Sequence, residues 1–458
     1  MRSLKLFLFV MSTVAAMLVP SGAVQARAPG GSADAGGSRA DAVLAWNANA
    51  GKAAVAACIA PFDNPLHESR LYAIVHIAIH DALNAIDRRS QPYAFRANVR
   101  RATSPDAAVA SAARHTLVPL LRQIPAPFPP TCGEAGVASV DADYAAALAS
   151  IPDGPAKARG VDLGRAAAAA ILTARAADGS DAPLVDPAYP QGTRPGEYRF
   201  TPGTPFVFGP HWAGVTPFVL RDSAQFRPDP PDPVSSRRYA ADLNEVKRLG
   251  GDGVMTPSVR TAAQTEIALF WVENSPHQWN RIARTVAAGR GLDMWANARL
   301  FGLLNMALAD GYVGSFEAKY RINYWRPVTA IQNADSDGNP NTAGDPTWTP
   351  LRPTPPIPEY DSGHSVEGAA AAAVMRRFFG TDRVRFAACS LTLPAGDTCG
   401  DASPVMREYR SFSQAADENG LSRILVGFHF RKAVDEGIEH GSRIGDRAFD
   451  RFLRPVHN

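Results

Sequence analysis

The sequence predicts a mainly α-helical protein made of two helical halves. Alanine, the residue that favours helix most strongly, occurs in runs at 166–170 and 369–373. Apolar residues recur at helical spacing along most of the chain, and no stretch shows the sustained alternation of a β-strand. The 458 residues allow two or three units and a large core. We therefore expect a helical-bundle body with long loops rich in proline and glycine.

The first 26 residues are typical of a secretory signal peptide. Arg2 and Lys5 precede an apolar run at 6–19, and small residues precede a cleavage position near Ala26. The run has 14 residues, whereas a membrane-spanning helix needs about 20. We therefore expect a secreted or periplasmic protein whose mature chain does not span a membrane.

The charge balance excludes a nucleic-acid-binding protein. The chain has 47 Lys and Arg against 44 Asp and Glu, and loss of the signal peptide with Arg2 and Lys5 lowers the net charge from +3 to +1. Proteins that bind nucleic acid or anionic membranes carry a large excess of positive charge. Any anion site in this chain must therefore be a local cluster of cations.

The first helical half covers residues 27–180 after the signal peptide. Ser104 and Pro105 are an N-cap followed by a first-turn proline, which predicts the start of a helix. The predicted helices of this half span residues 41–60, 68–86, 105–122, 141–151 and 161–177.

A connection rich in proline, glycine and aromatic residues follows at 181–234. Its aromatic side chains, which include Phe206, Phe208, Trp212 and Phe218, need burial. We therefore expect the connection to be ordered. The second half, 235–458, contains a long loop at 333–361. Its predicted helices span residues 235–249, 261–272, 276–288, 292–321, 365–379, 411–427 and 430–452.

If the protein is exported, its four cysteines can form disulfides, because an oxidising compartment permits them. Cys389 and Cys399 are expected to pair across a short loop, which leaves Cys58 to pair with Cys132. Four cysteines allow three connectivities, so spacing alone does not decide between them.

Three short segments of the second half carry the residues suited to chemistry. KYRINYWRP places Lys319 and Arg326 seven positions apart, about two turns of a helix or of its frayed end. DSGHS places Ser362, Gly363 and His364 directly before a predicted helix, whose N-terminus favours anions. SRILVGFH is expected to place Arg423 near the end of one helix and His429 near the start of the next, so both are candidate site residues.

Each segment alone has an ordinary structural explanation. Lys319 and Arg326 could form a solvated helix face, Ser362 could be a helix cap, and His429 could be a hydrogen-bonded core histidine. Together they supply three cations, a hydroxyl, a glycine at a helix start and two histidines. Guanidinium forks and a lysine charge are suited to a tetrahedral oxyanion.

These segments, in this order, resemble the signature of the vanadium-dependent haloperoxidase and type 2 phosphatidic acid phosphatase (PAP2) superfamily. The signature reads Lys, six residues, Arg-Pro; then Pro-Ser-Gly-His; then Ser-Arg, five residues, His. Further stretches at 75–86, 216–220, 323–332 and 412–430 resemble the bacterial haloperoxidase-like branch. The resemblance implies a helical body of the haloperoxidase type.

The resemblance also implies a role for each residue of the motif. His429 matches the axial ligand of vanadate, and His364 matches the acid–base histidine. The groups matched to the vanadate oxygens are Lys319, Arg326, Ser362, Gly363 and Arg423. The implied reaction takes hydrogen peroxide, a halide and an organic acceptor. One departure is Asp361, which stands where the family usually has proline; its carboxylate could repel an oxyanion or act as a partner that raises the pKa of His364.

Two other functions remain open at this stage. The same site suits a soluble acid phosphatase, in which His429 would attack a phosphomonoester and His364 would protonate the leaving group. A protein that only sequesters phosphate or vanadate would explain the cations but not His364. Separately, the loop DSDGN at 335–339 offers oxygen ligands like part of a calcium site, although it lacks the closing glutamate. A homo-oligomer is a further alternative that the sequence leaves open.

Overall fold

The described part of the chain is helical with two short hairpins, which confirms the predicted fold class. The computed structural model describes residues 41–99 and 102–456, so the predicted signal peptide lies outside the described residues. The helices that precede the connection are α1 (Ala42–Ala56), α2 (Pro65–Ile86), α3 (Pro105–Arg122), α4 (Pro130–Ala149) and α5 (Pro155–Ala174).

The connection at 181–234 is ordered, as expected. It holds the antiparallel strands β1 (Val185–Asp186) and β2 (Val207–Phe208) and the 3₁₀ turn η1 (Trp212–Gly214), with Val185 opposite Phe208. Trp212 and Phe218 are buried, whereas Phe206 and Phe208 are half-buried. The division of the chain into halves on either side of this segment stays a prediction.

The remaining helices build the region that contains the three motifs. They are α6 (Arg237–Leu249), α7 (Ala262–Phe270), α8 (Ser275–Arg290), α9 (Met294–Ile322), α10 (Pro327–Gln332), the 3₁₀ turn η2 (Ala334–Ser336), α11 (Gly363–Phe379), α12 (Phe412–Leu425) and α13 (Arg431–Arg451). A second antiparallel hairpin pairs β3 (Phe386–Ala388) with β4 (Arg407–Tyr409). Its three-residue strands are too short to give a period-2 pattern in the sequence.

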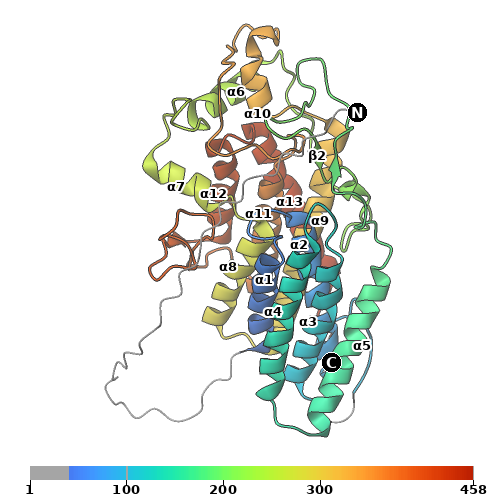
Figure 1. Cartoon of the computed structure of the whole chain (residues 1–458). Helices are drawn as coiled ribbons and strands as arrows, with labels where there is room; N and C mark the ends of the chain where they lie inside the picture. The colour runs from blue at the N-terminus through green and yellow to red at the C-terminus, as the bar shows by residue number, and fades with distance from the viewer. Residues whose placement is uncertain (1–40, 100–101, 457–458) are drawn as a thin grey trace, which may run out of the picture. The chain divides into compact units, whose positions relative to one another are not determined.

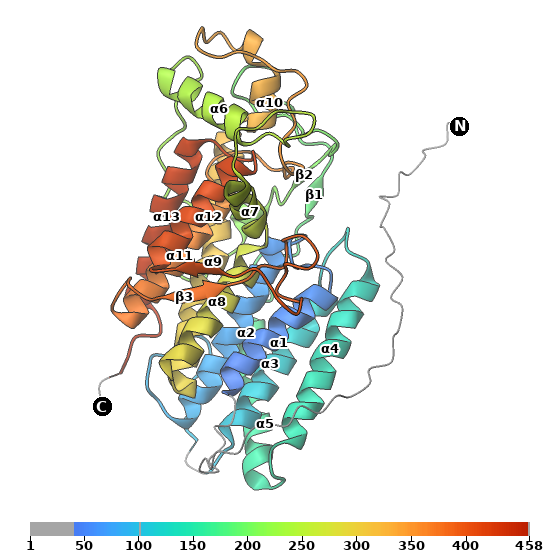
Figure 2. The ribbon, with the colours of Figure 1, turned by 90° about the vertical axis from the view of Figure 1, so that its left-hand side faces the viewer.

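Helix α9 lies at the centre of the fold. It packs against α2 on one side and against α11 on the other (Figures 1 and 2). Nearly every side chain from Asn297 to Lys319 is buried. A helix that is apolar around most of its circumference needs neighbours on all sides, and this position places Lys319, in its last turn, inside the protein.

Helices α11 and α13 approach each other closely because small residues line their contact. Gly437, Gly441 and Gly445 lie one turn apart on α13, and a Cβ at any of them would collide with Ser362, Val366 or Ala370 of α11 or its cap. The alanine run at 369–373 is buried in α11. Small side chains therefore hold the start of α11 against α13.

Both expected disulfides are formed. Cys58 pairs with Cys132 and Cys389 pairs with Cys399, with Cα–Cα distances of 5.6 and 5.2 Å. The described part of the chain has no free cysteine. The expected pairing is thereby confirmed.

Removing the two disulfides is expected to destabilise the fold unequally. The bridges close sequence separations of 74 and 10 residues, and by loop entropy their loss costs about 4 and about 3 kcal/mol respectively. Urea unfolding of Cys58→Ala/Cys132→Ala and of Cys389→Ala/Cys399→Ala, each compared with the unsubstituted protein, measures both costs. A larger loss of stability from the second pair would contradict the loop-entropy argument.

Candidate active site

The predicted site residues come from the ends of five helices. Lys319 is in the last turn of α9, Arg326 is the N-cap of α10, and Ser362 is the N-cap of α11. Arg423 is in the last turn of α12, and His429 lies two residues before α13 begins. Because α9 and α12 end where α11 and α13 begin, their side chains can meet although they are far apart in the sequence.

Lys319 and Arg326 bind the same loop, residues 357–361. The Lys319 ammonium donates to the carbonyl oxygens of Glu359 at 2.9 Å and Pro358 at 3.3 Å, and also contacts that of Asp361. Arg326 Nε donates to the Ile357 carbonyl at 2.6 Å. The two cations do not share a helix, because the chain turns at Asn323 with a left-handed backbone before Pro327 begins α10. Their proximity was predicted, but it comes from this turn and the shared loop.

The three site cations are buried without a counter-ion. Lys319, Arg326 and Arg423 are 3%, 1% and 3% exposed, and none forms an ion pair with a carboxylate among residues 41–99 and 102–456. Burial, followed by the charge of Arg326, lowers the pKa of Lys319 to about 7 and that of Arg423 to about 9. Burial also lowers the pKa of Arg326 to about 10. A buried charge normally requires a partner, so this cluster is electrostatically suited to an anion.

Glu359 fixes the orientation and the protonation of the His429 ring. Its Oε1 lies 3.0 Å from His429 Nδ1 and accepts the backbone N–H of Phe430 at 2.9 Å. Glu359 Oε1 is thus placed to accept a hydrogen bond from Nδ1. On the other side, Arg326 Nη1 lies 3.0 Å from His429 Nε2 and can only donate. His429 Nε2 is therefore unprotonated, and its lone pair, which accepts from Arg326 in this structure, is the one that a ligand nitrogen would use.

The turn between Arg423 and His429 explains their spacing. The Arg423 carbonyl accepts the backbone N–H groups of Phe428 at 3.0 Å and His429 at 3.2 Å. The turn needs a left-handed residue, and Gly427 supplies it with φ 87°. The Arg423 side chain donates to the Trp271 carbonyl at 2.9 Å, while its buried Nε has no partner in the described part of the chain. That orphaned donor is available to an anion.

The DSGHS segment begins α11 two residues earlier than predicted. Helix α11 starts at Gly363, so His364 is in its first turn and Ser362 is the cap. The Ser362 hydroxyl accepts from Ser365 Oγ at 2.8 Å and does not cap the helix. A Cβ at Gly363 would lie 3.9 Å from Lys319 Cε. Gly363 therefore lies directly beside the lysine at a helix N-terminus, where free N–H groups favour an anion.

Asp361 is not a partner of His364, so that part of the prediction is wrong. Its carboxylate accepts from Ser315 Oγ at 2.7 Å and pairs with His440 Nδ1 at 2.7 Å. Burial raises the pKa of Asp361, but His440, Lys319 and Ser315 outweigh burial and lower it. The side chain turns toward α9 and α13, where its charge is neutralised. The pKa of His364 is instead lowered well below its usual range by burial and by Arg423.

The oxygens of the predicted calcium loop bind groups of the loop itself. Asp337 accepts from Asn339 N and Thr342 Oγ1, and Asp335 accepts from Gly344 N. Across the described residues, no group of three or more His, Cys, Asp or Glu side chains is arranged to hold a metal ion. These contacts are those of a turn, and calcium stays a prediction that nothing in the loop supports.

Comparison with known proteins adds to this geometry. Residues 299–458 match the family model described as the VCPO second helical-bundle domain, and this range contains every residue of the predicted site. The vanadium chloroperoxidase of Curvularia inaequalis is 26% identical over 306 residues, which are 54% of this chain and 48% of that protein. The chain is therefore similar to vanadium-dependent haloperoxidases, most specifically over residues 299–458. The match spans about half the length of this curated relative.

Solved structures of the haloperoxidase family share the fold. The first bacterial vanadium-dependent iodoperoxidase superimposes with a TM-score of 0.73 at 24% identity, over 91% of this chain and 97% of that one. The holo-type bacterial vanadium-dependent chloroperoxidase gives 0.66 at 18% identity, over 88% and 95%. At identities below 25%, these similarities show that the helical fold is shared.

The donor set of this site fits vanadate. Vanadate is an oxyanion, and the site offers three buried cations without counter-ions, an orphaned Arg423 Nε, and a lone pair on His429 Nε2. The sequence did not predict two residues that contact the site histidines, Glu359 and Glu273. Glu359 precedes Ser362 by three positions in a loop, and Glu273 contributes its backbone carbonyl, so neither follows a helical pattern.

Proposed function

We propose that this chain is a vanadate-dependent haloperoxidase that oxidises halide with hydrogen peroxide. The observation that supports this most is the cluster of Lys319, Arg326 and Arg423, which is buried and lacks a carboxylate partner among the described residues. In this proposal the three cations hold the vanadate oxygens, together with the Ser362 hydroxyl and the Gly363 N–H. His429 Nε2 is the ligand to the metal.

The overall reaction reduces hydrogen peroxide to water, oxidises halide to hypohalous acid and consumes one proton. Bound vanadate supplies Lewis-acid activation of the peroxide. His364 moves the protons, since its neutral ring has a carbonyl acceptor at Nε2 and an unprotonated Nδ1. The burial of the site excludes water and strengthens each charge contact. Hypohalous acid then halogenates an organic acceptor.

The proposal is tested by assaying the purified mature protein after dialysis with orthovanadate. We expect peroxide-dependent oxidation of iodide, bromide or chloride, and loss of this activity in His364→Ala. Hydrolysis of a phosphomonoester that vanadate inhibits, with no halide oxidation, would identify a phosphatase instead. Vanadate binding without either activity would identify a sequestering protein.

The anion affinity of the vanadate-free site is expected to fall as the pH rises from 6 to 9. Lys319 has a pKa of about 7, so it loses its charge over this range, and Glu359, with a pKa of about 8, gains a negative charge. Both changes disfavour an anion, each by up to about tenfold per pH unit. Sulfate is the probe for calorimetry, because its charge is constant here.

Lys319→Met tests the assignment of this pH dependence. The variant should bind sulfate more weakly at pH 6 and show a shallower decline toward pH 9, because only Glu359 still titrates. An unsubstituted protein whose sulfate affinity is the same at pH 6 and pH 9 would contradict the role given to Lys319.

We also infer that the protein is exported. Two disulfides are characteristic of an oxidising compartment. None of the helices between residues 41 and 456 has the length and apolar composition that a membrane crossing requires. Expression with the native N-terminus, followed by N-terminal sequencing of the exported chain, should give a first residue near position 27. Assembly into a homo-oligomer stays a prediction.

A further inference from the structure

Backbone carbonyl groups just before α8 contact His364, and Glu273 makes the hydrogen bond to its Nε2. Its Nε2 lies 3.2 Å from the backbone carbonyl of Glu273, which precedes α8. A carbonyl can only accept, so Nε2 carries the ring proton and Nδ1 does not. The peptide that joins Glu273 to Asn274 therefore selects the tautomer of the histidine that moves protons in the proposed function.

The Asn274 side of this peptide is held by the first half of the chain. Asn274 N donates to the Pro61 carbonyl at 2.6 Å, and its side-chain amide donates to Glu68 at 2.7 Å and to Ile59 at 3.0 Å. These contacts anchor the N–H end of the peptide. They do not hold the Glu273 end, which is held by other residues.

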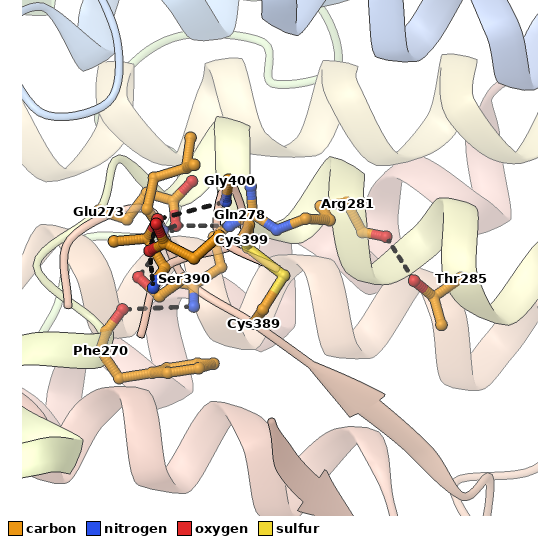
Figure 3. Close-up of a disulfide and its surroundings, with 12 residues drawn as sticks. Phe270, Glu273, Gln278, Arg281, Thr285, Cys389, Ser390, Cys399 and Gly400 are labelled. Carbon is orange, nitrogen blue, oxygen red and sulfur yellow. Dashed lines mark hydrogen bonds and ion pairs between the residues drawn. A yellow bond between two sulfur atoms is a disulfide. The ribbon is translucent and has the colours of Figure 1, made fainter. Parts of the chain in front are cut away.

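The Glu273 side chain is held by the loop that follows β3. It is fully buried, and its Oε2 accepts from Ser390 Oγ at 3.1 Å and from Leu391 N at 3.0 Å. Arg281 of α8 contacts the same oxygen. Figure 3 shows Glu273 and Ser390 facing each other beside the disulfide. Three donors on one buried oxygen fix the position of residue 273.

The Cys389–Cys399 disulfide closes this loop directly beside Ser390. Within the closed ring, Cys399 N donates to the Ser390 carbonyl at 2.9 Å, so Ser390 is fixed by a covalent bond on one side and a hydrogen bond on the other. The chain of contacts runs without a gap from the disulfide through Ser390 and Glu273 to the imidazole of His364.

We propose that Glu273 is a positioning residue for His364, and that the Cys389–Cys399 disulfide holds Glu273 in place through Ser390. This assignment rests on the proposed function for its catalytic consequence. Its structural consequence is the tautomer of His364, which can be measured without vanadate.

The charges around His364 decide which measurement is informative. Arg423 of α12, Lys319 of α9 and His429 before α13 all act on its ring. A change in its titration could therefore arise from any of these elements. The tautomer reports the Glu273 contact itself, and ¹⁵N chemical shifts of selectively labelled histidine distinguish a protonated from an unprotonated ring nitrogen.

The experiment compares the unsubstituted protein with Glu273→Ala and with Cys389→Ala/Cys399→Ala, all free of vanadate. We expect His364 to be a single Nε2–H tautomer in the first and a mixture in both variants. Glu273→Gln retains an oxygen for Ser390 and Leu391, so its spectrum should lie closer to the unsubstituted protein. With vanadate and peroxide, kcat should fall between about tenfold and a hundredfold in the two disruptive variants.

Ile171→Ala is the matched control for stability. Ile171 is fully buried in α5 and makes none of the contacts described above, so its loss lowers the melting temperature without touching Glu273. It should leave the His364 tautomer and kcat unaltered. A single tautomer in Glu273→Ala and in the disulfide variant would overturn the proposal. A mixed tautomer in these variants of a protein that has no peroxidase activity would uphold the positioning role and refute the proposed function alone.

Discussion

His429→Ala is expected to lose vanadate binding and halide oxidation together. His429 Nε2 is the unprotonated nitrogen of the ring, because Nδ1 faces Glu359 and Nε2 accepts from Arg326. Without this ligand, the affinity for vanadate should fall by at least about a hundredfold. Losing a residue that only orients a metal ligand lowers metal affinity by up to about a hundredfold, and losing the ligand itself should cost at least as much. Vanadate titration by calorimetry and a bromide oxidation assay measure the two losses.

Sulfate binding separates a lost ligand from a lost fold. Lys319, Arg326 and Arg423 are intact in His429→Ala, so sulfate should still bind at pH 6. His80→Ala is the matched control, because His80 is equally buried and hydrogen-bonds to Asp81 and Ser90. It should retain vanadate and activity. A His429→Ala protein that binds vanadate as tightly as the unsubstituted chain would show that another group is the ligand.

The parts of the site that sequence could predict are those at helix ends. Arg423 and His429 mark the end of α12 and the approach to α13, and Ser362 marks the start of α11. Helix ends are recognisable from capping residues and from the limits of apolar periodicity. Because these ends converge beside α9, the motif residues lie in one site. The same reasoning placed most helices within about four residues, but it began α4 eleven residues late and α5 six residues late, and it did not predict α10.

The parts that sequence could not predict depend on side-chain directions in loops. The backbone of residues 357–361 has no repeating period, so nothing indicated that Glu359 turns toward His429 and Asp361 turns away toward His440. Asp361 directly precedes Ser362 in sequence, and yet its carboxylate bonds to Ser315 and His440 and not to the predicted site residues. The Glu273 carbonyl was equally hidden, because every residue has a carbonyl and only the tertiary packing selects one.

Glu359→Ala is expected to weaken vanadate binding by roughly 10- to 100-fold. Glu359 Oε1 accepts from both His429 Nδ1 and Phe430 N. Without that acceptor the His429 ring can rotate or carry its proton on Nε2, where it would block the lone pair. Glu359→Gln provides an amide oxygen in the same place, so it should retain most of the affinity. Calorimetric titration with vanadate compares the two variants.

Asp310→Ala controls for the loss of a buried carboxylate. Asp310 is fully buried in α9 and accepts the backbone N–H groups of Phe218, Val219 and Leu220. Its removal should lower the stability while leaving the affinity for vanadate unchanged, because none of these contacts reaches the site. Equal affinities of Glu359→Ala and the unsubstituted protein would show that Arg326 alone orients His429. Equal losses in Glu359→Ala and Glu359→Gln would show that the charge of Glu359, and not its hydrogen bond, supports the ligand.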